Sequence, residues 1–349
     1  MKKQIFTLFC LSAFFWTAFK ADISIEKNYK KQLSEYAFFK GEMAELSPAE
    51  DLLPYALNAP LFSDYAEKQR FIRLPDGAKV NYREDQVLDF PEGTQIIKTF
   101  YYPVDARKPE KGRTLMETRV LMKEGGEWTA LPYIWNEEQT DAKLSVIGGK
   151  RDIEWRDENG KKQKLKYSVP NKNQCKGCHG YDKKVRPIGP SARQLNGDFA
   201  YHTGTENQLE HWRNMGIVEN LPTKEKLPQL ADYNNTEAHS LNDRARAYLD
   251  ANCAYCHNPH GAANTSGMFL HSTETDSAAL GVNKSPIAAG RGSGGKKYGI
   301  APGAPDESIL LHRMSSTDPG VRMPEIGRQL LHKEGIALIE EWIAQMPNK

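Results

Sequence analysis

Four of the five cysteines fall in two short segments that share one pattern. The first is Cys175-Lys176-Gly177-Cys178-His179, and the second is Cys253-Ala254-Tyr255-Cys256-His257. In a C-x-x-C-H segment, two thiols about one helical turn apart can add to the vinyl groups of one porphyrin, and the adjacent histidine supplies an axial nitrogen to the iron. These residues predict covalent attachment of c-type haem.

Disulfides and a zinc site with four thiolate ligands are the alternatives. Neither explains the histidines: with nine His in 349 residues, a His after both pairs by chance has odds of roughly 1 in 1,500. The interval between the pairs also exceeds the ~15–20 residues of a zinc ribbon. We therefore expect two covalently bound haem c groups, tethered by Cys175, Cys178, Cys253 and Cys256, with His179 and His257 as axial iron ligands.

The first 21 residues resemble a secretory signal. Met1-Lys2-Lys3 precedes an apolar stretch over residues 5–19, which is shorter than the ~20 residues of a spanning helix. The sequence predicts a signal peptide over 1–21 and a periplasmic protein, which agrees with haem attachment outside the cytoplasm. Phe19-Lys20-Ala21 is a poor cleavage sequence, so an uncleaved signal that anchors the protein to the envelope is the alternative.

The charge balance argues against a nucleic-acid partner. The chain has 47 Lys and Arg against 45 Asp and Glu, and loss of residues 1–21 removes three lysines and no acid. A nucleic-acid-binding protein needs a concentrated basic face. We expect redox partner proteins, possible envelope association and no small-molecule substrate.

Residues 22–170 have the pattern of an all-β domain, with short apolar and aromatic runs between turn signals. The expected strands are 69–74, 94–102, 115–122, 128–135, 151–155 and 162–169. This spacing predicts a β-sandwich-like domain. The region contains no His and no Cys, which argues against an imidazole- or thiolate-bound metal there.

From residue 171 onward the pattern changes to helices and loops. We expect a first haem unit over 171–235, with a helix from about Glu206 to Val218, and a second haem domain over 236–349. In the second, Ser240 predicts the N-cap of a helix over Leu241–Asn252, and an apolar stripe predicts a helix from His332 to about Met346. The predicted fold class is multidomain α+β: the β-sandwich-like domain followed by two mainly α-helical haem domains.

The second unit resembles a class I cytochrome c domain. The resemblance is carried by a helix leading into Cys253-Ala254-Tyr255-Cys256-His257, a long loop with Arg322-Met323-Pro324, and a C-terminal helix. It implies that Met323 is the sixth iron ligand, with Met314 and Met268 as rivals. Met/His ligation raises the reduction potential of haem.

The first unit is similar but lacks a Met-Pro. Its Gly189-Pro190 step resembles the one whose proline carbonyl orients the axial histidine in that family. For its sixth ligand the candidates are Met215, His202 and His211, and an open iron is the remaining possibility.

The whole chain resembles a group of exported bacterial dihaem c-type cytochromes with an N-terminal β-domain. Besides the haem motifs, the resemblance is carried by residues 135–142 and by Val169-Pro170-Asn171. It implies single-electron transfer rather than an enzymatic reaction. The alternative is a peroxidase-like dihaem enzyme with an open first haem, although dihaem peroxidases space their motifs further apart. A third hypothesis makes the β-domain a docking module for a partner.

Overall fold

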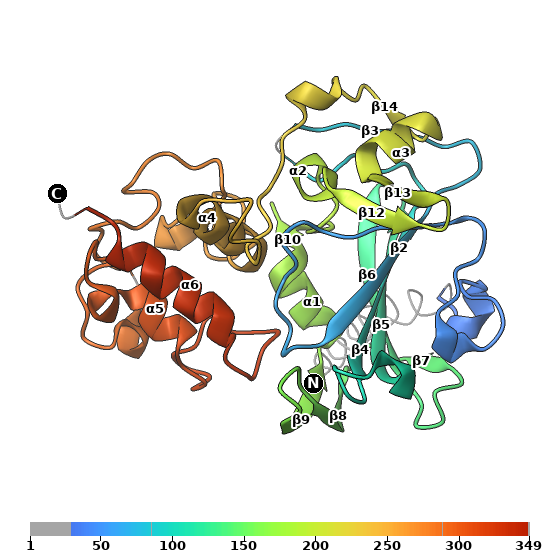
Figure 1. Cartoon of the computed structure of the whole chain (residues 1–349), viewed down its shortest axis with the longest axis horizontal. Coiled ribbons are helices and arrows are strands. Elements are labelled where there is room, and N and C mark those ends of the chain that lie inside the picture. The colour runs from blue at the N-terminus through green and yellow to red at the C-terminus, as the bar shows by residue number, and fades with distance from the viewer. Residues whose placement is uncertain (1–28, 85, 288, 348–349) are drawn as a thin grey trace, which may run out of the picture.

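A six-stranded antiparallel sheet forms the centre of the structure, a computed structural model that describes residues 29–347 except 85 and 288 (Figure 1). The predicted signal peptide, 1–21, lies outside these residues. The strands run in the order β1-β2-β4-β5-β6-β7. Their bounds are Leu52–Pro54, Glu67–Arg73, Gln95–Pro103, Arg113–Glu124, Glu127–Trp135 and Ala142–Leu144.

All six predicted strands are confirmed in position, but the predicted sandwich is wrong. Four of them belong to one sheet, and the other two, β8 (Gly149–Arg156) and β9 (Lys162–Val169), form a separate hairpin. The spacing of strands along a sequence does not say how they divide among sheets. Here one face of the sheet is covered by non-strand residues of the N-terminal segment, including Leu33, Phe38 and Leu46, so no second large sheet is needed.

The opposite face of the sheet carries two apolar clusters separated by charged side chains. Because side chains alternate along a strand, Arg70, Ile72, Ile96, Lys98 and Phe100 all point to this face. At one end, Ile72 and Ile96 pack with residues of the segment 171–235. At the other end, Phe100 packs under the β8–β9 hairpin. The charged middle of this face borders the site described below.

Short helices and strands make up the remainder of the chain. The helices are α1 (Lys172–His179), α2 (Ala192–Leu195), α3 (Gln208–Asn214), α4 (Leu241–Asn252), α5 (Ile309–Met314) and α6 (Lys333–Ala344). The minor strands are β3 (Val80–Asn81), β10 (Gly180–Tyr181), β11 (Lys184–Val185), β12 (Asp198–Tyr201), β13 (Gly204–Asn207) and β14 (Val218–Glu219).

The prediction of two mainly α-helical haem domains is therefore wrong. The first unit mixes helices of 8, 4 and 7 residues with short β-ladders. The second has helices of 12, 6 and 12 residues joined by long loops rich in glycine and proline. These residues cannot extend a helix, because glycine loses much conformational freedom and proline lacks the backbone donor. The chain as described is mostly β-structure and loops.

The two helices predicted in the second unit are nevertheless confirmed, whereas the one predicted from about Glu206 to Val218 is shorter, as α3 (Gln208–Asn214). Helix α4 spans the predicted residues, and the Ser240 side chain accepts a hydrogen bond from the Asp243 amide at 3.1 Å, as an N-cap does. Helix α6 begins after His332 and buries Ile339, Trp342 and Ile343. The two helices pack together and, with α5, lie together on one side of the sheet (Figure 1). None of the described helices has the length and apolar character needed to span a bilayer.

Candidate functional site

The first C-x-x-C-H segment is held on α1, which packs against β6. Asn171 and Gln174 form a reciprocal capping box at its start, with bonds of 2.9 Å each. The fixed N-terminus sets the rotation of the helix, so that Cys175, Cys178 and His179 all line one cavity. All three residues of the first motif therefore meet at one place.

The imidazole of His179 is oriented by the backbone. Its Nδ1 lies 2.8 Å from the Arg186 carbonyl oxygen. Donation from Nδ1 to a carbonyl fixes the tautomer and leaves Nε2 with its lone pair, which is the arrangement of a metal-binding histidine. Burial lowers the pKa of His179 to about 4, so the ring is neutral. The expectation that Pro190 orients this ring is wrong, since the Pro190 carbonyl accepts from the Leu88 amide instead.

The cavity has a volume of about 470 Å³, within the ~300–1,000 Å³ range of small-molecule and cofactor sites. It reaches from the first motif to the second, where Cys253 and Tyr255 form part of its wall. Met323, the predicted sixth ligand of the second haem, also lines it, as does its rival Met314. One cavity thus joins residues that the sequence assigns to two haems.

The second motif lies at the end of α4, in turns rather than in a helix. Cys253 caps α4, and the His257 amide donates to the Cys253 carbonyl at 2.9 Å. The Nδ1 of His257 lies 3.3 Å from the Ser266 hydroxyl, and burial lowers the pKa of the ring. Cys256 and His257 are not among the described residues that line the cavity. The structure gathers the second motif less completely than the first.

The two motifs are in direct contact. The Cys256 thiol donates to the Gly177 carbonyl at 3.7 Å. Immediately after the motifs, the Nδ1 of His260 lies 2.9 Å from the Asp182 carboxylate, which can only accept a hydrogen bond, and the His260 ring centroid lies 4.6 Å from that of Tyr181. These contacts hold two segments that are far apart in the sequence side by side.

The loop that carries Met323 is organised by one buried arginine. Arg328 is 5% exposed, and its guanidinium donates to the carbonyls of Arg313, Met314, Ser316 and Met323 at 2.7–3.2 Å. A single planar donor group that satisfies several carbonyls fixes the path of a loop without regular structure. Sequence analysis missed Arg328, because nothing in its neighbours signals such a role.

The three candidates for the sixth ligand of the first haem lie elsewhere. Met215 is 50% exposed, at the end of α3. His202 is exposed, and His211 stacks on Tyr201 with 3.8 Å between ring centroids. None of these three is among the described residues that line the cavity with His179.

Two histidines that the sequence does not indicate as site residues line the cavity. His271 has its Nδ1 3.5 Å from the Asp250 carboxylate, next to Arg193. His332 is stacked on Phe62 with 4.2 Å between ring centroids, and its Nδ1 lies 3.1 Å from the Tyr248 hydroxyl. Neither follows a motif, so only the folded chain reveals their position.

Burial of His332 predicts a dependence of stability on pH. Desolvation lowers its pKa to about 4. The charge of Lys68 also lowers this pKa, and the charge of Glu334 opposes the shift. Below the ordinary value near 6.5, the unfolded chain binds a proton that the folded chain does not, so stability falls as the pH falls from about 6.5 to about 4. The shift corresponds to about 3 kcal/mol in total.

The His332→Gln variant removes this titration. We expect the free energy of unfolding of the variant to fall less between pH 7 and pH 4.5 than that of the native protein, as measured by urea denaturation at both values. Equal losses in the two proteins would contradict the prediction.

The four described cysteines are all free thiols. Burial raises the pKa of each, to about 12 for Cys253 and Cys256. Zinc binds the thiolate form of cysteine, which a raised pKa disfavours. In the part of the chain that is described, no three His, Cys, Asp or Glu side chains form a cluster that could hold a metal ion.

Cationic side chains of the sheet form part of the wall of the cavity. Arg70, Lys98 and Arg119, from β2, β4 and β5, line the cavity together with the motif residues. Arg70 is 8% exposed, and its Nε and Nη2 have no hydrogen-bond partner. In the sequence, these cations interrupt strands that are otherwise rich in apolar residues, which could have indicated a site. That the three cations lie next to one another depends on the register of the strands, which the sequence does not show.

The residues present at the first motif fit a covalent haem. Two thiols and a histidine with a free Nε2 face one cavity, and the unpartnered buried guanidinium of Arg70 suits an anionic group such as a propionate. The second motif fits in part, through Cys253. Comparison with protein families, characterised proteins and solved structures finds no match to this chain.

Proposed function

We propose that the protein is a dihaem c-type cytochrome that transfers single electrons in the periplasm or cell envelope. The observation that carries the proposal is the geometry of His179, whose Nδ1 is held by the Arg186 carbonyl while Nε2 remains available beside Cys175 and Cys178 in one cavity. Covalent haem supplies a one-electron ferric/ferrous couple there.

The chain's own residues have five roles in this proposal. Cys175 and Cys178 tether one haem, and Cys253 and Cys256 tether the other. His179 would bind the iron of the first haem, and His257 and Met323 would bind the iron of the second. Arg328 positions Met323, and the contacts of Tyr181 and Asp182 with His260 keep the two attachment segments together, which shortens the path for electrons between them.

The proposal is tested on the exported full-length chain. Its mass under denaturing conditions counts covalent haems, and reductive titration with optical detection follows their redox cycle. Low-temperature EPR of the oxidised protein then distinguishes low-spin from high-spin iron. We expect two covalent haems that cycle reversibly, one with the ferric methionine-to-iron charge-transfer band. A chain that leaves the exporting cell without covalent haem would contradict the proposal.

Arg328→Gln is expected to remove the methionine band without removing either haem. The variant deprives the buried carbonyls around Met323 of their donor, at a cost of about 1–3 kcal/mol for each carbonyl left unsatisfied. Loss of Met/His ligation lowers the reduction potential of that haem. The control is Arg322→Gln, beside Met323, which loses the same charge but only long bonds of 3.2–3.4 Å to the Glu325 carbonyl. Retention of the band in Arg328→Gln would refute the positioning role.

A peroxidase-like enzyme with an open first haem is the second candidate. It is favoured by the position of Met215, His202 and His211, which lie away from the cavity of His179. A high-spin EPR signal, and spectral changes on addition of cyanide or peroxide, would support it. Two low-spin haems whose spectra neither ligand alters would count against it.

A further inference from the structure

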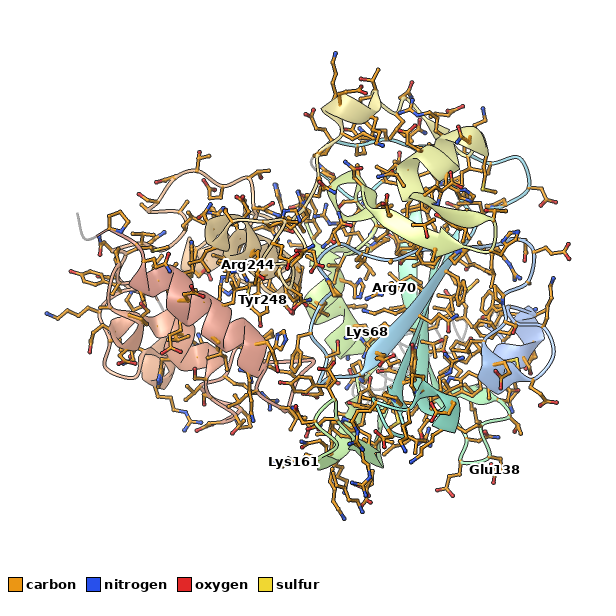
Figure 2. All side chains as sticks on the ribbon, in the orientation of Figure 1. Lys68, Arg70, Glu138, Lys161, Arg244 and Tyr248 are labelled. Atoms are coloured by element: carbon orange, nitrogen blue, oxygen red, sulfur yellow. The ribbon has the colours of Figure 1, made fainter. Side chains whose placement is uncertain are left out.

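Three cations stand side by side across the middle of the sheet. Arg70 of β2 is the register partner of Lys98 of β4, and Lys98 is the partner of Arg119 of β5. Directly opposite side chains on adjacent strands have Cβ atoms about 4.5–5.5 Å apart. We call Arg70, Lys98 and Arg119 the cation row. Figure 2 shows Arg70 on β2 with Lys68, a further cation two residues earlier on the same strand.

The protein neutralises the cation row only in part. Arg119 has a carboxylate partner, Glu117, at 2.6 Å. Arg70 is 8% exposed and has two guanidinium nitrogens without a partner. Burial and the neighbouring cations Arg70, Lys68 and Arg119 lower the pKa of Lys98. Like charges directly opposite each other destabilise a sheet. The Phe100 ring, whose centroid lies 4.7 Å from Lys98 Nζ and 4.4 Å from Arg119 Cζ, stabilises these two cations but not Arg70.

The surroundings point to a ligand. On the same sheet face the cation row lies between two apolar clusters, one containing Ile72 and Ile96 and the other containing Phe100. The row lines the cavity that holds Cys175, Cys178 and His179. An anion in the cavity would reach both the row and the motif.

We propose that the cation row is a carboxylate-binding site, and that the propionates of the haem tethered by Cys175 and Cys178 occupy it. This inference rests on the proposed function. It gives the β-domain a direct part in the first haem site: the sheet supplies the charges that hold the anionic edge of the cofactor. Carboxylates bound by Arg and Lys form charge-assisted hydrogen bonds, which are stronger than neutral ones.

The test compares reduction potentials of full-length variants that carry both haems. Arg70→Gln and Lys98→Gln each remove one positive charge from the row, and Lys161→Gln removes one from the exposed β8–β9 turn, which Figure 2 shows away from β2. Loss of a cation near the haem favours the more positive ferric form. We expect each row variant to shift the ferric/ferrous ratio of one haem about tenfold toward ferric, which equals about 59 mV for one electron. Lys161→Gln should leave both potentials unchanged.

A conservative variant separates charge from packing. Arg70→Lys keeps the positive charge and is expected to keep the native potential. If Arg70→Gln does not fold, Lys98→Gln, whose side chain is less buried, carries the test. Potentials of Arg70→Gln and Lys98→Gln that equal those of Lys161→Gln would overturn the proposal.

Sodium acetate distinguishes haem propionates from a diffusible carboxylate. At constant ionic strength, acetate should not change the potentials of the native protein if propionates fill the row. An acetate-dependent shift that disappears in Lys98→Gln would overturn the propionate assignment while keeping carboxylate binding. If the mass of the denatured chain shows no covalent haem, the proposed function is refuted before any potential is measured. In that case acetate binding measured by calorimetry tests the row by itself, and its absence would refute carboxylate binding as well.

Discussion

The Cys175→Ser/Cys178→Ser double variant is expected to carry one covalent haem per chain, against the two that we propose for the native protein. Serine cannot form a thioether, and both thiols of the first motif face the cavity beside His179. Haem content is measured from the absorbance of the reduced pyridine complex per protein chain, after extraction of any haem that is not covalently bound. The EPR species that disappears is then assigned to the first motif.

The mirror variant, Cys253→Ser/Cys256→Ser, is its matched control. It should also retain one haem, but the remaining spectrum should be that of the first motif, without the methionine band. Two haems in either double variant, or the same spectrum in both, would refute the assignment of one haem to each motif.

Glu117→Gln is expected to lower the free energy of unfolding by about 3–5 kcal/mol, because it leaves the Arg119 cation buried without a carboxylate. Glu117 is fully buried, accepts from Arg119 at 2.6 and 2.8 Å, and accepts from the Tyr167 hydroxyl at 2.6 Å. Glu117 is also the anion beside a row of cations, so its loss adds to their repulsion. Urea denaturation followed by tryptophan fluorescence measures the change.

Glu154→Gln is the control for this variant. Glu154 of β8 pairs with Lys162 and Lys164, but at the surface. Exposed ion pairs contribute little to stability, because water and salt screen them. Its unfolding midpoint should equal that of the native protein. A loss in Glu154→Gln comparable to that in Glu117→Gln would mean that burial does not decide the effect.

Local structure was predictable from the sequence because its signals are local. Alternating apolar runs bounded by turns located β2, β4, β5, β6, β8 and β9, and the Ser240 cap with its apolar stripe located α4. The division of strands into one sheet and one hairpin depends on pairing between distant residues, which no single segment specifies. The segment around Leu33 and Phe38, which covers one face of the sheet, has no strand pattern at all.

The candidate site divides in the same way. The motif cysteines and histidines are recognisable because their spacing is fixed by chemistry within five residues. The carbonyl that orients His179 comes from Arg186 rather than from the expected Pro190, because the turn after α1 brings that oxygen to the ring. The alignment of Arg70, Lys98 and Arg119 exists only once three strands pair in register.

The burial of Cys175 has a consequence for the biogenesis of the protein. Its side chain is 5% exposed and belongs to the core that joins the sheet to the first unit, with Ile72, Leu195 and Trp212. A haem ligation enzyme could not reach this sulfur in the folded chain. On the proposed function, thioether formation therefore precedes closure of this core, and the cofactor is built into the chain while it folds after export.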